Sequence, residues 1–103
     1  MSRIEQLQRM WDADQTDADI PYMIAQEHVS AGDHQASIAW FDRCLTLDAE
    51  YHYAYFHKAR ALDAIGHDEE AVIAASAGLA RARVAGHQKA VDELAGLVEM
   101  LEG

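Results

Sequence analysis

AGDHQASIAWFDRCLTLD, residues Ala31 to Asp48, decides the fold of this chain. It begins with a Gly-Asp turn signal and continues with apolar residues three or four apart, the period of one face of an α-helix. A similar stretch, IGHDEEAVIAASAGLARA, begins 34 residues later at Ile65. The two stretches indicate an internal repeat, whose units complete their core only by stacking on one another.

The rest of the sequence is also typical of helices. It contains one proline, and apolar residues recur at helical spacing, as in Val91, Leu94 and Leu101. Breaks that contain Gly or Asp divide the chain, because Gly ends helices in the left-handed conformation and Asp caps the helix that follows. We therefore predict an all-α fold of about six helices, over 3–12, 19–31, 34–47, 52–65, 68–84 and 88–102.

Length and charge limit the classes of function. A chain of 103 residues forms one small domain, and its net charge of -10 disfavours binding to nucleic acid or to an anionic membrane surface. The sequence has no apolar run long enough to span a membrane and no apolar leader at its start. We therefore expect a cytoplasmic protein with neither nucleic-acid nor membrane partners.

Sliding the sequence by 34 residues aligns its two halves. Gly32 then falls on Gly66, and Ile38 falls on Val72, so the turn and the apolar spacing recur together. The start of the chain fits the same register, because Leu7 falls on Phe41. The N-terminal helix is therefore a copy of the second helix of a pair.

These features resemble the tetratricopeptide repeat family, whose unit is a 34-residue helix-turn-helix with small residues where its helices touch. Matching residues in the second copy are Tyr55, Ala59, Leu62, Gly66, Ala71 and Leu79, and in the first copy Ile24, Ala25, Gly32, Phe41 and Leu45. Departures from the family pattern are His28, Ser37 and Ala75 within the units, and Ala49 and Arg83 in place of a closing proline.

The resemblance implies an α-solenoid of antiparallel helix pairs in a single domain, 1–103. Its parts are an N-terminal half-repeat or cap helix at 1–17, repeats at 18–51 and 52–85, and a C-terminal capping helix at 86–103. In this architecture the first helix of each pair lines a concave groove, and terminal helices cover the apolar ends of the stack.

The resemblance also implies a non-enzymatic module that binds a peptide or protein segment in this groove. The implied groove residues are Tyr22, Met23, Gln26, Tyr53, Phe56, His57, Arg60 and Asp63, with Asp19 and Val29 beside them. Their spacing supports this, since Tyr53, Phe56 and Arg60 share one helix face. Aromatic side chains, Met and Arg are enriched at interfaces. The plainer alternative is that Tyr22 and Phe56 are buried under neighbouring helices.

The charge of the chain indicates what such a partner carries. A protein at -10 attracts basic segments, so we expect a peptide with apolar anchors and basic character. The family's carboxylate-binding subset uses Lys and Asn in the groove, a set that is missing here, where Arg60 is the only groove cation. Arg60 pairs either with an acid of its own surface such as Asp63 or, less readily, with a carboxylate of the partner.

A homo-oligomeric scaffold is the alternative function, using the convex face or an open end of the stack. Trp40 directly follows Ala39 and precedes Phe41, so it points about 100° away from Phe41 on the helix. We expect Trp40 on the outer, convex side, where a large aromatic marks possible self-association.

A small enzyme or a metal-binding protein is a remote alternative. His52 and His57 lie on different sides of their helix, so they are a poor pair of metal ligands. The acids after His67 occupy the first turn of a helix, where their negative charge interacts favourably with the N-terminal end of the helix dipole and needs no metal. Cys44 stands where the family prefers Ala, so we expect a buried, inert thiol. The sequence lacks a phosphate-binding loop and a nucleophile elbow. We therefore predict no catalytic residue, no metal site and no cofactor.

Overall fold

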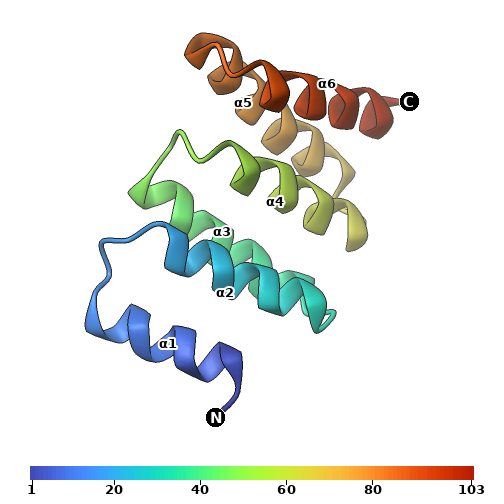
Figure 1. Cartoon of the computed structure of the whole chain (residues 1–103). Coiled ribbons are helices and arrows are strands. Elements are labelled where there is room, and N and C mark those ends of the chain that lie inside the picture. The colour runs from blue at the N-terminus through green and yellow to red at the C-terminus, as the bar shows by residue number, and fades with distance from the viewer.

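The computed structural model describes all 103 residues and contains six α-helices joined by short turns (Figure 1). The helices are α1 (Arg3–Ala13), α2 (Asp19–Ser30), α3 (His34–Leu47), α4 (His52–Ala64), α5 (Asp68–Ala85) and α6 (Gln88–Glu102). The predicted all-α fold is confirmed, and every helix boundary lies within one residue of its predicted position.

Three of the turns repeat one backbone geometry. Gly32, Gly66 and Gly86 adopt left-handed conformations with φ of 79°, 81° and 70°, which residues with a Cβ rarely adopt. After Gly32, the Asp33 amide donates to the His28 carbonyl at 2.9 Å. The residues after Gly66 and Gly86 form the equivalent bonds, at 2.9 and 3.0 Å. This pattern closes the ends of α2, α4 and α5 in the same way and turns the chain back on itself.

The starts of the following helices are closed differently from one another. The Asp33 side chain accepts from the Ala36 amide at 3.1 Å, as an N-cap aspartate does. His67 holds the same position before α5 without a side-chain cap, and Asp68, Glu69 and Glu70 occupy the first turn of that helix. The prediction that these acids open a helix is confirmed, and their charge favours the N-terminal end of its dipole.

The helices stack in two layers. α2, α4 and α6 form the layer nearer the viewer in Figure 1, while α3 and α5 lie behind them. α1 packs against α2 at one end of the stack, and α6 packs against α4 and α5 at the other. The result is a slab whose principal extents are 41 × 29 × 18 Å.

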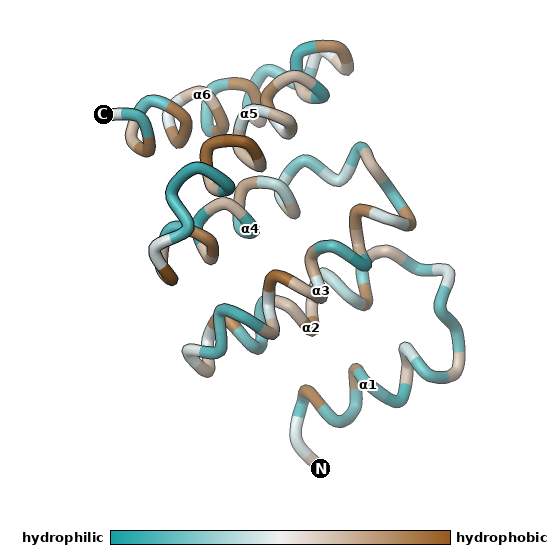
Figure 2. Tube along the Cα trace, turned by 180° about the vertical axis from the view of Figure 1, so that it is seen from behind, coloured by the Kyte–Doolittle hydropathy of each residue, from teal (hydrophilic) through white to brown (hydrophobic).

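The core follows the 34-residue register. Ile24, Ala25 and Phe41 are fully buried in the first helix pair, and Ala59 and Ala71 are fully buried in the second. Hydrophobic and hydrophilic residues alternate along the helices (Figure 2), as expected where each helix buries only part of its circumference. None of the helices combines the length and the apolar character needed to cross a bilayer.

Close contact between α4 and α5 depends on a residue without a side chain. A Cβ built on Gly78 would lie 2.5 Å from the Tyr55 Cβ and 2.9 Å from its Cγ. The Tyr55 hydroxyl donates to the Ala49 carbonyl at 2.8 Å, which fixes the ring across this contact. Gly78 therefore lets the two helices approach more closely than alanine would allow.

The prediction that Trp40 points outward from the convex side is wrong. Trp40 is only 8% exposed, because α1 lies over this part of α3. The Trp11 and Trp40 rings meet edge to face with centroids 5.9 Å apart, and the Arg43 guanidinium lies 4.0 Å from the Trp40 ring centroid. The 100° separation between Trp40 and Phe41 fixes only where Trp40 lies on α3. It does not account for α1, which packs over Trp40 and buries it.

Candidate peptide-binding groove

The structure brings the predicted residues of α2 and α4 together along one surface. The rings of Tyr22 and His57 lie 6.0 Å apart, and those of Phe56 and His57 lie 5.3 Å apart. The Gln26 amide donates to the Tyr22 hydroxyl at 3.1 Å. We call this surface the groove face and define it by Tyr22, Gln26, Tyr53, Phe56, His57 and Arg60.

The aromatic residues of the groove face are only partly buried. Phe56 packs against the apolar clusters that α4 forms with α5 and α6. Tyr22 packs against Phe41 and Tyr51, with ring centroids 5.9 and 4.8 Å away. Each aromatic thus keeps some surface exposed. Tyr22 and Phe56 are therefore not fully buried under neighbouring helices, and their contact with a peptide stays a prediction.

Two predicted groove residues lie apart from this cluster. Met23 turns toward α1, where its sulfur accepts from the Arg3 guanidinium at 3.8 Å. Asp63 is exposed near the end of α4 and forms no ion pair. Neither residue contacts the aromatic cluster in the way that His57 does.

A third helix contributes to the groove face. The Tyr53 hydroxyl donates to the Glu93 carboxylate of α6 at 3.4 Å. Glu93 was not among the predicted groove residues, because α6 was interpreted only as a terminal cap. The 34-residue register places Glu93 on Ala59, a fully buried position, so the repeat pattern does not identify Glu93 as a groove residue.

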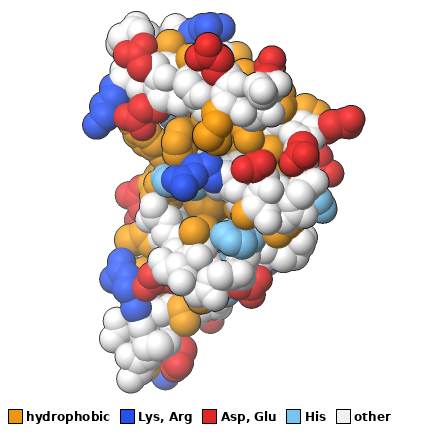
Figure 3. Space-filling view, turned by 90° about the vertical axis from the view of Figure 1, so that its right-hand side faces the viewer, with side chains coloured by type: hydrophobic (Ala, Val, Ile, Leu, Met, Phe, Trp, Pro, Cys, Tyr) orange, Lys and Arg blue, Asp and Glu red, His pale blue; other side chains and the backbone are white.

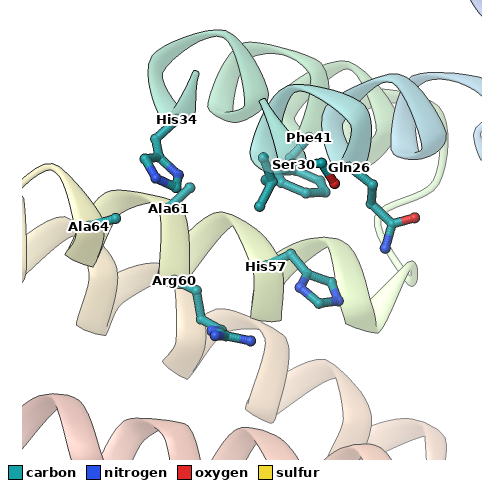
Figure 4. A pocket seen from close by; sticks show the side chains of 9 residues that line it. Gln26, Ser30, His34, Phe41, His57, Arg60, Ala61 and Ala64 are labelled. Carbon is teal, nitrogen blue, oxygen red and sulfur yellow. The ribbon is translucent and has the colours of Figure 1, made fainter. Parts of the chain in front are cut away.

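A cavity of about 320 Å³ opens between α2, α3 and α4, at the end where Gly32 turns the chain (Figure 4). This is within the size range of small-molecule and side-chain pockets. Its lining residues are Gln26, Val29, Ser30, His34, Phe41, His57, Arg60, Ala61 and Ala64.

The sequence predicted only part of this lining. The sequence predicts Gln26, Val29, His57 and Arg60 in the groove, whereas it indicates a turn at Ser30 and His34. Phe41 was expected in the core, and it is fully buried, so it forms the floor. No local signal marks Ser30 and His34 as pocket residues, because only the packing of α4 against α2 and α3 encloses them.

Arg60 has no carboxylate partner in the molecule. The arginine and lysine ion pairs join Arg3 to Glu27, Lys58 to Asp42 and Arg81 to Glu50. The prediction that Arg60 pairs with an acid such as Asp63 is therefore wrong. Its guanidinium lies 6.0 Å from the Phe56 ring centroid instead, so the aromatic ring holds the cation at the cavity mouth.

Burial and Arg60 both act on the neighbouring imidazole. Burial lowers the pKa of His57, Arg60 lowers it further, and Glu93 partly offsets the change. His57 is therefore neutral at pH 7. Burial also raises the pKa of Tyr22, which keeps that phenol protonated. The groove face thus presents Tyr22 and His57 in their neutral forms beside the cation of Arg60.

The sequence model of the tetratricopeptide repeat family matches residues 18–51, which span α2, α3 and the loop after them. Residues 18–51 therefore form a tetratricopeptide repeat, and the six-helix fold is that of tetratricopeptide repeat proteins. A tetratricopeptide repeat domain protein of Salinibacter ruber, solved by crystallography, is 26% identical with a TM-score of 0.77, over 84% of this chain and 98% of that chain.

Other solved structures share this fold. A solution structure of a Salinibacter ruber tetratricopeptide repeat domain protein is 27% identical, with a TM-score of 0.80 over 87% of this chain and 91% of that chain. A protein of Bordetella parapertussis is 22% identical and shares the fold, with a TM-score of 0.84 over 99% of this chain and 89% of that chain. No curated protein matches the chain.

The thiol of Cys44 lies in the core. Cys44 is fully buried, and burial raises its pKa to about 12, with Asp48 and Asp19 contributing further. The predicted buried thiol is confirmed, and at neutral pH it carries no thiolate with which to act as a nucleophile.

The side chains that could bind a metal ion are dispersed. No three side chains of His, Cys, Asp or Glu are arranged to hold a metal ion. The nearest approach of histidines is between His52 and His87, whose ring centroids lie 5.5 Å apart. The fold itself is typically a non-enzymatic module for protein-protein interaction.

Proposed function

We propose that this tetratricopeptide repeat protein binds a peptide or protein segment on the groove face, and that the segment carries apolar anchors and a net positive charge. The observation that carries this proposal is the cluster of half-buried aromatic rings around the unpaired Arg60. Aromatic side chains and arginine dominate binding energy at interfaces because they bring large contact areas at modest entropic cost.

The charge of the molecule supports the second half of the proposal. The chain carries 18 acidic residues against 8 basic ones, so its field attracts a basic segment over distances of about 10 Å at moderate salt. Glu93, which bonds to Tyr53 of the groove face, offers a carboxylate to basic residues of such a segment, and Asp63 offers another near the end of α4.

The experiment is a selection of 12-residue peptides from a displayed random library on the wild-type protein, followed by titration of the selected peptide against variants. Tyr53→Ala should weaken binding by about 1 to 3 kcal/mol, as truncation of an aromatic anchor does. Phe56→Leu should weaken it less, and it keeps most of the core packing. Ile73→Ala is the matched control, because Ile73 is 67% exposed on α5, away from the groove face.

Helical content by circular dichroism should stay the same in all three variants. Wild-type affinity in Tyr53→Ala and Phe56→Leu, with loss in Ile73→Ala, would place the working surface on α5 and reject the groove proposal.

Self-association is a second candidate function, because α5 leaves large apolar side chains in solvent. Ile73 is 67% exposed and Val84 is 91% exposed, and burying such side chains against a second copy stabilises an interface. Light scattering after gel filtration tests this candidate. A dimer that Ile73→Asp converts to a monomer would support it, and a monomer at high concentration would dismiss it.

A further inference from the structure

The outward side of α5 carries an exposed apolar stripe, formed by Ile73, Ala77, Ala80 and Val84. These residues follow one another at intervals of four, three and four positions. At about 100° per residue they lie within about 60° of one another around the helix. The fully buried Ala82 lies on the opposite side of α5. The α5 stripe therefore faces away from the rest of the molecule.

The spacing of the α5 stripe is that of a seam between two helices. Apolar residues alternately three and four apart occupy the positions at which two helices pack side by side. Ala77 and Ala80 let a second helix approach closely at the centre, while Ile73 and Val84 provide larger apolar surface at the ends. Figure 2, which views the side where α3 and α5 lie, shows a hydrophobic stretch directly after the hydrophilic start of α5.

A cavity of about 270 Å³ lies beside the first half of the α5 stripe. Ile73 and Ala77 line it from α5, and Tyr55 and Leu62 line it from α4. A helix packed along the stripe can place a side chain in this cavity, which adds apolar contact to that of the stripe itself.

The charges along α5 indicate what covers the stripe. Asp68, Glu69 and Glu70 occupy the first turn of the helix, whereas Arg81 and Arg83 lie near its other end. Figure 3, which views the side where the α4–α5 turn lies, shows several acidic side chains gathered there. An identical helix placed antiparallel brings opposite charges together at both ends, whereas a parallel copy brings like charges together.

Two of these charged residues are free to pair with a second copy. Glu69 and Arg83 form no ion pair within the chain, whereas Arg81 is paired with Glu50. Around the helix, Glu69 and Arg83 lie on the same side of the α5 stripe. A two-fold axis that relates two antiparallel helices keeps that side unchanged, so Arg83 of each copy extends toward Glu69 of the other.

We propose that α5 of a second copy of this chain covers the α5 stripe, packed antiparallel about a two-fold axis. The inference rests on the candidate function of self-association, and it adds which helices meet and in which orientation. Ile73 of each copy then packs against Val84 of the other, with Ala77 and Ala80 at the centre.

The size of this contact predicts a weak dimer. The 18 residues of α5 span about 27 Å, so one pair of helices buries less than the roughly 800 Å² per partner of a standard interface. We expect a dissociation constant on the order of 0.1 mM. No residue of α5 belongs to the groove face, so both copies keep that face open.

Cysteine cross-linking tests the orientation. In the antiparallel dimer, the two copies of residue 77 lie about 5 Å apart along the helix axis, and the two copies of residue 84 about 16 Å apart. A short bis-maleimide should therefore link Ala77→Cys at least fivefold faster than Val84→Cys. Cys44 is fully buried and gives no background. Equal rates, as in a parallel dimer, would overturn the proposal.

Charge reversal tests the pairing of Glu69 with Arg83. Arg83→Glu should raise the dissociation constant of the dimer about tenfold, because it turns two attractive pairs into two repulsive ones. The double variant Glu69→Arg/Arg83→Glu should restore the wild-type value. Arg9→Glu makes the same change in net charge at an exposed position of α1, and it should have little effect. Sedimentation equilibrium measures the constants, and circular dichroism confirms the fold of each variant.

The outcomes separate this inference from the proposals on which it rests. A dimer that Ile73→Asp disrupts, but that Arg83→Glu leaves unchanged, would overturn the antiparallel pairing and retain self-association through α5. A chain that stays monomeric up to about ten times the expected dissociation constant would overturn both. In either case the selected peptide should still bind one per chain, because the groove face is separate from α5.

Discussion

The absence of a side chain at Gly78 controls how closely α4 and α5 pack. Gly78→Ala would place a Cβ 2.5 Å from the Tyr55 Cβ, an atom that cannot move without its backbone. The two helices must therefore separate, and we expect a loss of about 1 to 3 kcal/mol in the free energy of unfolding, despite the better helix propensity of alanine.

Gly96→Ala is the matched control for this substitution. A Cβ at position 96 meets nothing within 4 Å, and the residue lies in the interior of α6. Alanine there should stabilise the protein by about 0.5 to 1 kcal/mol through helix propensity alone. Urea titration of both variants measures the difference, and a Gly78→Ala protein as stable as the wild type would contradict the close contact.

His57 gives the protein a pH-dependent stability of known sign. Burial, followed by Arg60, lowers the pKa of His57 below its ordinary value of 6.5, so the unfolded chain binds a proton more readily than the folded one. The stability associated with neutral His57 is thus complete above pH 6.5 and is lost as pH falls through the lowered folded pKa.

Thermal melts at pH 7.5 and at pH 5.5 test this contribution. Wild-type protein should lose more stability between these values than His57→Gln does, because glutamine does not titrate. His28→Gln is a control for the removal of a histidine elsewhere. A wild-type melting temperature that rises on acidification relative to His57→Gln would contradict the sign.

Among the elements, α6 is the one whose loss should be most costly. Leu94 and Leu97 of α6 are buried against α4 and α5, and Leu79 of α5 is only 8% exposed beneath it. Truncation after Gly86 uncovers Leu79 and Phe56, at about 1.5 to 3 kcal/mol for each large side chain. Since a small domain has about 5 to 15 kcal/mol in total, we expect cooperative melting to disappear.

Differential scanning calorimetry of the truncated chain measures this effect. A sharp transition near the wild-type temperature would show that α6 does not cap the stack. The substitution Met100→Ala in the intact helix serves as a control, because Met100 is 63% exposed and its removal should leave the transition in place.

The helices could be predicted from sequence because their ends carry local signals. Gly32, Gly66 and Gly86 each need a left-handed backbone, and Asp33 caps the next helix through its own side chain. The 34-residue register likewise identified buried positions such as Ala59 and Ala71. These features depend on residues close together in sequence, or on a period that sequence displays.

The features that escaped prediction depend on contacts between helices. Trp40 is buried because α1 crosses it, and no property of α3 alone reveals this. Arg60 remains unpaired because the acidic residues close to it in sequence form no ion pair with it in the folded structure. The cavity combines side chains of α2, α3 and α4, so its shape exists only once the three helices have packed.

At the scale of the whole molecule, the net charge of -10 should govern how fast a basic segment arrives. Contacts between the aromatic rings and the segment depend little on salt, whereas long-range attraction is screened with a Debye length of about 10 Å at 0.1 M and about 3 Å at 1 M. The two contributions can therefore be separated by their response to salt.

Raising salt from about 0.05 M to about 0.5 M should slow association of the selected basic peptide by roughly tenfold or more, with little change in its dissociation rate. Asp63→Asn removes one exposed carboxylate of α4, three residues after Arg60, and should reduce the salt dependence. Asp12→Asn makes the same change in charge on α1, where the effect should be smaller because α1 lies at the far end of the stack. Stopped-flow fluorescence of a labelled peptide measures both rates. If the association rate does not depend on salt while Tyr53→Ala still weakens binding, the aromatic residues bind the segment as proposed. The proposal that the segment carries a net positive charge would then be rejected.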